Sequence, residues 1–166
     1  MSKPHIDLLK EYLHYDEGTG IFTWLRSTTN SVNVGDVAGC AHKKGYTYIM
    51  FANKQYRAHR LAWFYVYGIW PTDQIDHINS VRGDNRISNL REATRQENTR
   101  HAPVRKHTAS GYKGVYKNGN KWMAQIKMDT KTKKYLGNFD TPEEAYEVYK
   151  VAAFDLHKEF LHRSIK

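Results

Sequence analysis

An aspartate and a histidine stand side by side at the end of a short apolar run, at Asp76 and His77, and an asparagine-rich polar segment follows them. Hydrolysis of a phosphodiester needs an activated water and a cation that holds negative charge on the phosphate and the leaving oxygen. The carboxylate of Asp76 and the amide of Asn98 offer the hard oxygen donors that suit Mg²⁺ or Mn²⁺. Neutral imidazole suits His77 as a general base near neutral pH.

Neighbouring side chains on a strand point to opposite faces, so Asp76 and His77 can serve one site only where the strand ends or bends. Asn89 is suited to hydrogen-bond a backbone group nearby and to hold the loop that carries the histidine. Asn79 and Asn85 fit turn positions, where asparagine is frequent. The residue types alone leave two interpretations open, a hydrolytic site and an ordinary structural Asp-His pair.

The spacing of these residues resembles that of the HNH endonucleases of the homing type. The matching residues are Asp76-His77, Asn89-Leu90-Arg91 and Glu97-Asn98, with the preceding segment 58–63, inside about residues 45–100. The resemblance implies a ββα-metal fold, in which a hairpin and a helix surround one divalent ion. It implies that Asp76 and Asn98 bind the metal, that His77 is the general base and that Asn89 orients it. Asn98 stands where the most familiar pattern has histidine, which favours Mg²⁺ or Mn²⁺.

The resemblance also implies a reaction. His77 would deprotonate a water that attacks the scissile phosphorus in line, leaving 5′-phosphate and 3′-hydroxyl ends. One chain holds one such site, so we expect a monomer to nick, whereas a double-strand cut needs a homodimer on DNA or sequential cuts. The family is common in phages and introns, which suggests genetic mobility. Arg86 and Arg91 are candidates to hold phosphates, and the alternative for Arg86 is a solvated position in the loop. His59 could approach the site, but we expect it to make a structural hydrogen bond instead.

Several elements must position these residues. The apolar spacing predicts a helix over 6–15, a strand over 20–25, a hairpin over 45–59, a buried helix over 60–68 ended by Gly68 and a strand from Gln74. Thr94 and Glu97 have the capping-box spacing, which predicts a helix start that carries Asn98 in its first turn. Residues 1–44 contain no motif, and they either complete the nuclease core or add a DNA contact.

Residues 101–110 are rich in Pro, Ser, Thr and bases and are predicted to be a linker between a nuclease domain, 1–100, and a second domain, 111–166. Three short strands follow, with Asn118-Gly119 as a hairpin turn. Thr141, Pro142 and Glu144 predict a helix start, and an apolar stripe should pack this helix on the sheet. Ala145, Val148, Ala152 and Leu156 form that stripe, with Tyr149 and Phe160 adding bulk. The fold class is α+β, a ββα-metal nuclease domain followed by a three-stranded antiparallel sheet packed on one helix.

The second domain resembles the Apetala/ethylene-response-factor DNA-binding domain over about residues 110–160. The residues that carry the resemblance are Tyr112-Lys113-Gly114-Val115, Lys121-Trp122, Ala124, Ile126, Tyr135-Leu136-Gly137, Phe139 and the 141–145 helix start. In that family the sheet enters the major groove of double-stranded DNA. The implied contacts are Lys113, Tyr116, Lys117, Lys127, Lys133 and Tyr135, and Trp122 is expected in the core. Lysine lacks the guanidinium fork that reads guanine, so we expect firm phosphate contact and looser base readout.

The charge fits a nucleic-acid partner. The formal net charge is +9, and residues 100–134 contain ten Lys or Arg and one acid. There is no apolar run long enough for a membrane span, no secretory signal and only one cysteine, so we expect a cytoplasmic protein without a disulfide. The leading hypothesis is a metal-dependent DNA endonuclease. The alternatives are a non-catalytic DNA-binding protein and a protein that binds or cleaves RNA.

Overall fold

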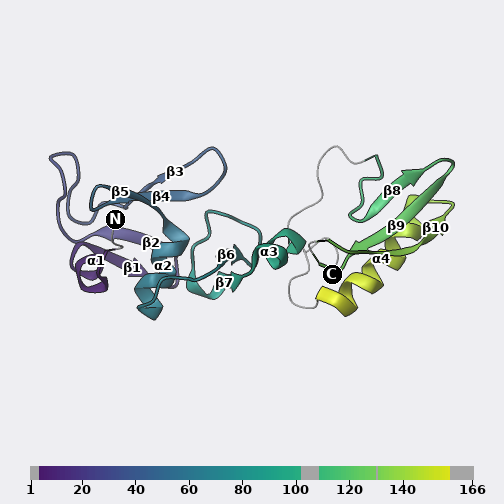
Figure 1. Ribbon diagram of the computed structural model, residues 1–166. Helices are drawn as coiled ribbons and strands as arrows, with labels where there is room; N and C mark the ends of the chain where they lie inside the picture. The colour runs from purple at the N-terminus through teal and green to yellow at the C-terminus, as the bar shows by residue number, and fades with distance from the viewer. Residues whose placement is uncertain (1–3, 102–108, 130, 158–166) are drawn as a thin grey trace. The chain divides into compact units, whose positions relative to one another are not determined.

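The computed structural model describes residues 4–101, 109–129 and 131–157, and it divides into two compact units at the Ala93–Thr94 bond (Figure 1). The elements of the first unit are α1 (Ile6–Tyr12), β1 (Leu13–Asp16), β2 (Ile21–Trp24), β3 (Cys40–Ala41), β4 (Thr47–Phe51), β5 (Lys54–Arg57), α2 (Ala58–Tyr67), β6 (Gln74–His77), η1 (Ile87–Asn89) and β7 (Leu90–Ala93). Those of the second are α3 (Arg95–His101), β8 (Val115–Asn118), β9 (Lys121–Lys127), β10 (Lys133–Phe139) and α4 (Pro142–His157). Most of the predicted linker 101–110 lies outside the described residues, so the predicted domain boundaries stay a prediction.

The first unit contains three small antiparallel sheets, β1-β2, β3-β4-β5 and β6-β7. The predicted hairpin over 45–59 is confirmed as β4 and β5, joined by Ala52 and Asn53. Both turn residues have positive φ, 48° and 58°, as a two-residue hairpin turn with the favoured twist requires. The predicted helix over 6–15 is too long, because its last residues form β1. Leu13 and Tyr15 are buried while their neighbours are exposed, which is the period of a strand.

The described part of residues 1–44 belongs to the hydrophobic core of the first unit. Leu9 of α1, Leu13 of β1 and Phe22 of β2 are buried in one cluster that also contains Leu61 of α2 and Ile75 of β6. The predicted buried helix is α2, and it ends where the sequence indicated. Gly68 caps it in the left-handed conformation with φ 71°. The helix and the hairpin β6-β7 are therefore fixed by apolar packing from the N-terminal elements.

The second unit is a three-stranded antiparallel sheet, in the order β10-β9-β8, with α4 lying along one face (Figure 1). This confirms the predicted architecture of a sheet packed on one helix. Its buried residues are Val115, Ala124, Ile126, Ala145, Tyr149 and Ala153, and Trp122 is partly buried against them as predicted. The start of α4 is also as predicted, since the Glu144 amide donates to Thr141 Oγ1 at 3.3 Å.

The predicted apolar stripe of α4 is partly wrong. Ala145 is buried, but Val148 and Leu156 are 36% and 38% exposed, and the inward positions that follow are Tyr149 and Ala153. The buried side of α4 differs from the prediction because Gly114 lets the backbone before β8 approach Tyr149 closely. A Cβ on Gly114 would lie 2.1 Å from the Tyr149 ring, so the segment before β8 sits directly on this side chain. Phe160 lies outside the described residues.

Among residues 4–101, 109–129 and 131–157, no helix has both the length and the apolar character needed to cross a bilayer.

Candidate active site

The aspartate and histidine of the motif lie on β6, whose partner strand is β7. In this pair Asp76 is opposite Arg91, and His77 is opposite Leu90. His77 is the last residue of β6, and the chain turns at once, since the Ser80 amide donates to the His77 carbonyl at 2.8 Å. The strand end that the two residues need is therefore present. Both are buried, with 5% of Asp76 and 4% of His77 exposed.

The carboxylate of Asp76 is held by an arginine from the opposite strand. Arg91 approaches Asp76 Oδ2 with Nε at 3.0 Å and with Nη2 at 2.9 Å. The exposed fractions of the Arg91 and Asp76 side chains are 16% and 6%, so the carboxylate is buried and the guanidinium is mostly buried. A carboxylate removed from water needs such a counter-charge, because burying an isolated ion is costly. Arg91 thus has a structural partner, and its predicted DNA contact stays a prediction.

The imidazole of His77 lies against an asparagine that the sequence assigned only to a turn. His77 Nε2 is 3.4 Å from Asn85 Oδ1, and Asn85 is itself buried. Burial lowers the pKa of His77 below its ordinary value, and the Asn85 contact opposes this shift only in part. The ring is therefore neutral near pH 7, as a general base must be. The assignment of Asn85 is corrected, since it contacts the candidate base.

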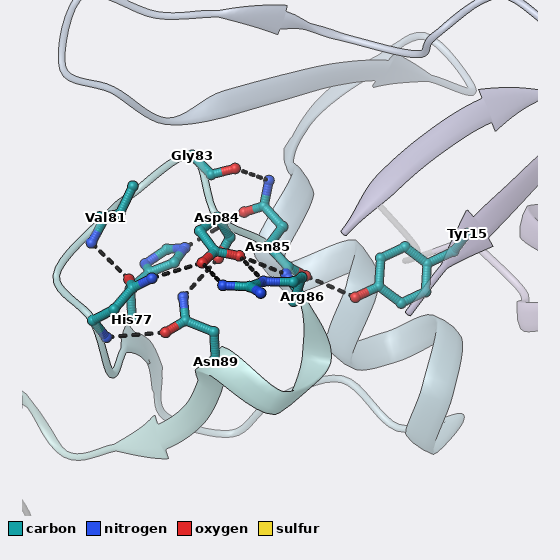
Figure 2. A network of polar contacts seen from close by, with 9 residues as sticks. Tyr15, His77, Val81, Gly83, Asp84, Asn85, Arg86 and Asn89 are labelled. Atoms are coloured by element: carbon teal, nitrogen blue, oxygen red, sulfur yellow. Dashed lines mark hydrogen bonds and ion pairs between the residues drawn. The ribbon is translucent and has the colours of Figure 1, made fainter. Parts of the chain in front are cut away.

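Asn89 holds the loop that follows His77 (Figure 2). Its Oδ1 accepts a hydrogen bond from the Asn79 amide at 2.9 Å, and its Nδ2 donates to the Asp84 carbonyl at 2.8 Å. The Ile78 amide donates to the Asn89 carbonyl at 2.9 Å. The predicted backbone hydrogen bonds of Asn89 are therefore present, and they fix both ends of the loop. An orienting role for Asn89 in catalysis stays a prediction.

A carboxylate organises the middle of the same loop. Arg86 donates to Asp84 Oδ1 from Nε at 2.8 Å and to Oδ2 from Nη2 at 2.6 Å, as Figure 2 shows. Asn79 Nδ2 donates to Asp84 Oδ2 at 2.6 Å. Hydrogen bonding from Arg86 lowers the pKa of Asp84 to about 2, so the carboxylate stays ionised. The Arg86 guanidinium is thus engaged inside its own loop, and its predicted phosphate contact stays a prediction.

The N-terminal hairpin braces this loop. Tyr15 of β1 donates from its hydroxyl to the Asn85 carbonyl at 2.7 Å (Figure 2). Gly20, which precedes β2, has φ 75°, and a Cβ there would lie 2.4 Å from the Arg86 amide nitrogen. The turn therefore rests directly on the backbone of Asn85 and Arg86. Sequence reasoning missed both braces, because no local pattern connects residues 15 and 20 with the motif.

A second histidine packs against the first. The rings of His59 on α2 and His77 are 5.0 Å apart between centroids and nearly perpendicular, at 88°. Among the described residues no hydrogen-bond partner reaches His59 Nδ1, so the expected structural hydrogen bond is not found at this atom. Burial lowers the pKa of His59 to about 3. His59 is therefore a neutral packing residue behind the candidate base.

Asn98, the second predicted metal ligand, lies in the first turn of α3. The predicted capping box is confirmed, since Glu97 Oε2 accepts from the Thr94 amide at 2.8 Å and the Glu97 amide donates to Thr94 Oγ1 at 3.3 Å. The Asn98 amide donates to the Thr94 carbonyl at 3.0 Å. The helix belongs to the second unit, so the role of Asn98 as a ligand rests on the motif and stays a prediction.

Four of the six predicted DNA contacts share the sheet face that points away from α4. Residues opposite each other in an antiparallel pair lie on one face. Lys127 is opposite Lys133, and Tyr135 is opposite Gln125, two residues before Lys127 on β9. Tyr116 is opposite Met123, which continues the same alternation. The side chains of Tyr116, Lys127, Lys133 and Tyr135 are exposed.

The other two predicted contacts differ. Lys117 is opposite Trp122, on the helix side of the sheet, although its own side chain is exposed. Lys113 precedes β8 and is half-buried, and its burial lowers the pKa of the amine to about 8. The six residues therefore do not form one continuous surface, and the outward face is carried by the other four.

Comparison with known proteins agrees with the geometry of the first site. Residues 56–100 match the family model described as HNH endonuclease. The match begins in β5, spans α2 and the β6-β7 hairpin with its loop, and ends in α3. This segment is an HNH endonuclease domain, of the class that hydrolyses phosphodiester bonds of DNA. No curated protein and no solved structure matches the chain.

Proposed function

We propose that the chain is a metal-dependent DNA endonuclease that uses Asp76 and His77 as its reactive pair. The observation that supports this most is the way His77 is held, buried at a strand end with Nε2 against Asn85 and with a loop behind it that hydrogen bonds of Asn79, Asp84 and Asn89 hold in place. A general base must be neutral and fixed in orientation to take a proton efficiently. The surroundings of His77 meet both requirements.

The proposed step divides between the two ring nitrogens. With Asn85 Oδ1 as the acceptor, the ring proton lies on Nε2 and the lone pair on Nδ1. Nδ1 then takes the proton of the attacking water, and the Nε2–H···O contact stabilises the resulting imidazolium. Asn89 contributes by fixing the backbone on which Asn85 and His77 are placed. The products would carry 5′-phosphate and 3′-hydroxyl ends.

The donor chemistry of the motif fits a hard divalent cation. Asp76 supplies a buried carboxylate and Asn98 an amide oxygen, and such oxygens are preferred by Mg²⁺ or Mn²⁺. HNH nucleases generally use one divalent metal, and we propose these two residues as its protein ligands here. The bound ion would supply positive charge to the phosphate and the departing oxygen.

We further propose that the second unit binds double-stranded DNA through the outward face of its sheet. The exposed side chains of Lys127 and Lys133 offer phosphate contacts, and those of Tyr116 and Tyr135 offer aromatic surface. The arrangement of sheet and helix is compatible with an Apetala/ethylene-response-factor-like domain. Together the two units suit a site-preferring nicking or homing enzyme of phage type. A homodimer on DNA would be needed for concerted double-strand cutting.

Relaxation of supercoiled plasmids with Mg²⁺ or Mn²⁺ tests the nuclease. We expect wild type to nick and His77→Ala to lose activity by about 10²–10⁴-fold, as for removal of a general base. His14→Ala is the matched control, since His14 is an exposed histidine on β1. Failure of wild type to cut any of several plasmids would support the non-catalytic alternative. Preference for single-stranded RNA over duplex DNA in competition would support an RNA-directed protein.

A further inference from the structure

A tyrosine stands beside the candidate base. Tyr46 directly precedes β4 and is half-buried, and its ring centroid lies 5.4 Å from that of His59 and 6.1 Å from that of His77. Side chains that contact the Tyr46 ring therefore lie near the His77 imidazole, which would activate the water.

Two arginines lie against the ring of Tyr46. The guanidinium carbons of Arg57 and Arg82 are each 5.0 Å from its centroid, which is the range of a cation–π contact. Each arginine has a second anchor. Arg57 Nε donates to the Tyr48 hydroxyl at 3.3 Å, and Arg82 Nη1 donates to the Lys44 carbonyl at 3.1 Å. Arg57 comes from β5 and Arg82 from the loop after His77, so the ring brings together cations from two distant segments.

The charge of this pair is not compensated within the described residues. No carboxylate there forms an ion pair with Arg57 or Arg82, and both side chains are exposed. The two guanidinium carbons are separated by at most twice the distance from each to the ring centroid. Two exposed guanidinium groups within this distance of each other form a local positive surface that attracts a polyanion.

The remaining arginines around the site are engaged differently. Arg86 and Arg91 pair with Asp84 and Asp76, and Arg60 donates to the carbonyls of Pro71 and Asp73. Arg57 and Arg82 keep guanidinium N–H groups that donate to no described residue. Guanidinium N–H donors of this kind match the oxygens of a phosphate.

We propose that Arg57 and Arg82, held on Tyr46, bind the phosphodiester backbone of DNA at the position where His77 activates water. This deepens the proposed nuclease function and rests on it. Preorganised guanidinium groups stabilise the charge that develops on the phosphate oxygens in the transition state. The sequence pointed to Arg86 and Arg91 for phosphate contact, which stays a prediction, and Arg57 and Arg82 are a further pair of candidates.

The first test measures cleavage. Under single-turnover conditions with supercoiled plasmid and Mg²⁺ or Mn²⁺, we expect Arg82→Gln and Arg57→Gln each to slow nicking by about 10- to 100-fold, below the loss seen for a single oxyanion-hole donor because each cation is exposed. Arg82→Lys should recover part of the rate. Arg26→Gln is the matched control, since Arg26 lies 5.6 Å from the Tyr12 ring centroid, in a comparable contact elsewhere. Tyr46→Phe should keep the rate and Tyr46→Leu should lower it.

The second test does not depend on cleavage. In a His77→Ala background, binding of a short mixed-sequence DNA duplex is measured over a range of salt concentrations. Each glutamine substitution should lower the slope of log K against log salt by about one, the value for one lost phosphate contact. Thermal unfolding identifies any variant that fails to fold, and Arg82→Lys, which keeps the charge, should retain the slope.

The outcomes separate the two proposals. If wild type does not cut but the slopes change as expected, the nuclease proposal fails and the phosphate site stands. If wild type cuts, and both glutamine variants match Arg26→Gln in rate and slope, the phosphate site is wrong while the nuclease proposal stands. If wild type does not cut, and folded His77→Ala does not bind DNA at any salt concentration, both proposals are overturned.

Discussion

The loop after His77 and the outward face of the C-terminal sheet are both polar, yet they are built in opposite ways. In the loop Asp84 and Asn89 are hydrogen-bonded by other loop residues, Asn85 accepts a bond from Tyr15 of β1, and Asn85 and Asn89 are buried. On the sheet Lys127 and Lys133 project into solvent. Loss of a buried polar contact costs much free energy, because the remaining partner is left unsatisfied, whereas an exposed contact contributes little to stability. The loop therefore suits catalysis, and the sheet suits binding of an extended polyanion.

We expect the largest change in the free energy of unfolding from loss of the ion pair between Arg91 and Asp76. Replacing Arg91 by Met leaves the Asp76 carboxylate without this counter-charge, and the free energy of unfolding should fall by about 3–5 kcal/mol. The matched variant is Arg26→Met, whose exposed pair with Glu11 should contribute at most about 1 kcal/mol. Urea unfolding of both variants measures this. Equal losses would mean that burial does not distinguish the two pairs.

We expect the second-largest loss of stability from disturbing the contact between Gly20 and the backbone of Arg86. Gly20→Ala places a methyl group against the Arg86 amide and retains a positive φ, so we expect a loss of about 2–3 kcal/mol and slower plasmid nicking. Gly35→Ala is the control, because Gly35 has φ 91° with no atom within 4 Å of the added Cβ. It should show only the backbone strain, about 1–2 kcal/mol. A smaller effect at Gly20 than at Gly35 would contradict the contact with the loop.

Acid should weaken the first unit through His59. Its pKa is about 3 in the folded state and about 6.5 when unfolded, so below pH 6.5 the unfolded chain binds one more proton than the folded chain. Stability is then complete above pH 6.5 and decreases as pH falls, by about 1.4 kcal/mol per unit for one proton. Unfolding free energies between pH 7 and pH 5 should show a shallower slope in His59→Gln. His14→Gln, at an exposed histidine on β1, is the control variant.

The smallest effects on stability are expected on the sheet. Lys127→Gln and Lys133→Gln should each change the free energy of unfolding by less than about 0.5 kcal/mol, because both side chains are exposed. Each should lower the salt dependence of DNA binding by about one unit of slope. Lys150→Gln on α4 is the control, since Lys150 pairs with Glu147 on the helix. A slope lost equally at Lys150 would show that the outward face of the sheet is not special.

Local patterns in the sequence predicted much of the fold. The capping box at Thr94–Glu97 and the left-handed cap at Gly68 depend on neighbouring residues only, and both are present. The hairpin predicted at Asn118-Gly119 is also present, but its two loop residues are Gly119 and Asn120, because Asn118 is the last residue of β8 and pairs with Lys121. The predictions were wrong where tertiary packing, and not the local sequence, determined the secondary structure or the buried face of an element. The end of α1 became β1 because Leu13 and Tyr15 pack into the core, and the buried side of α4 was set by the approach of Gly114 to Tyr149.

The sequence by itself determined which chemistry is available, because one continuous segment contains the residues of the motif at their typical spacing. These residues are Asp76, His77, Asn89 and Asn98. Only the tertiary structure decided how His77 is held and which arginines face outward. The contacts responsible are Tyr15 with Asn85, Asn85 with His77, and Tyr46 with Arg57 and Arg82. Tyr15 with Asn85 and Tyr46 with Arg82 join residues far apart in the chain, and no local periodicity encodes contacts that form only when separate elements pack around a common core.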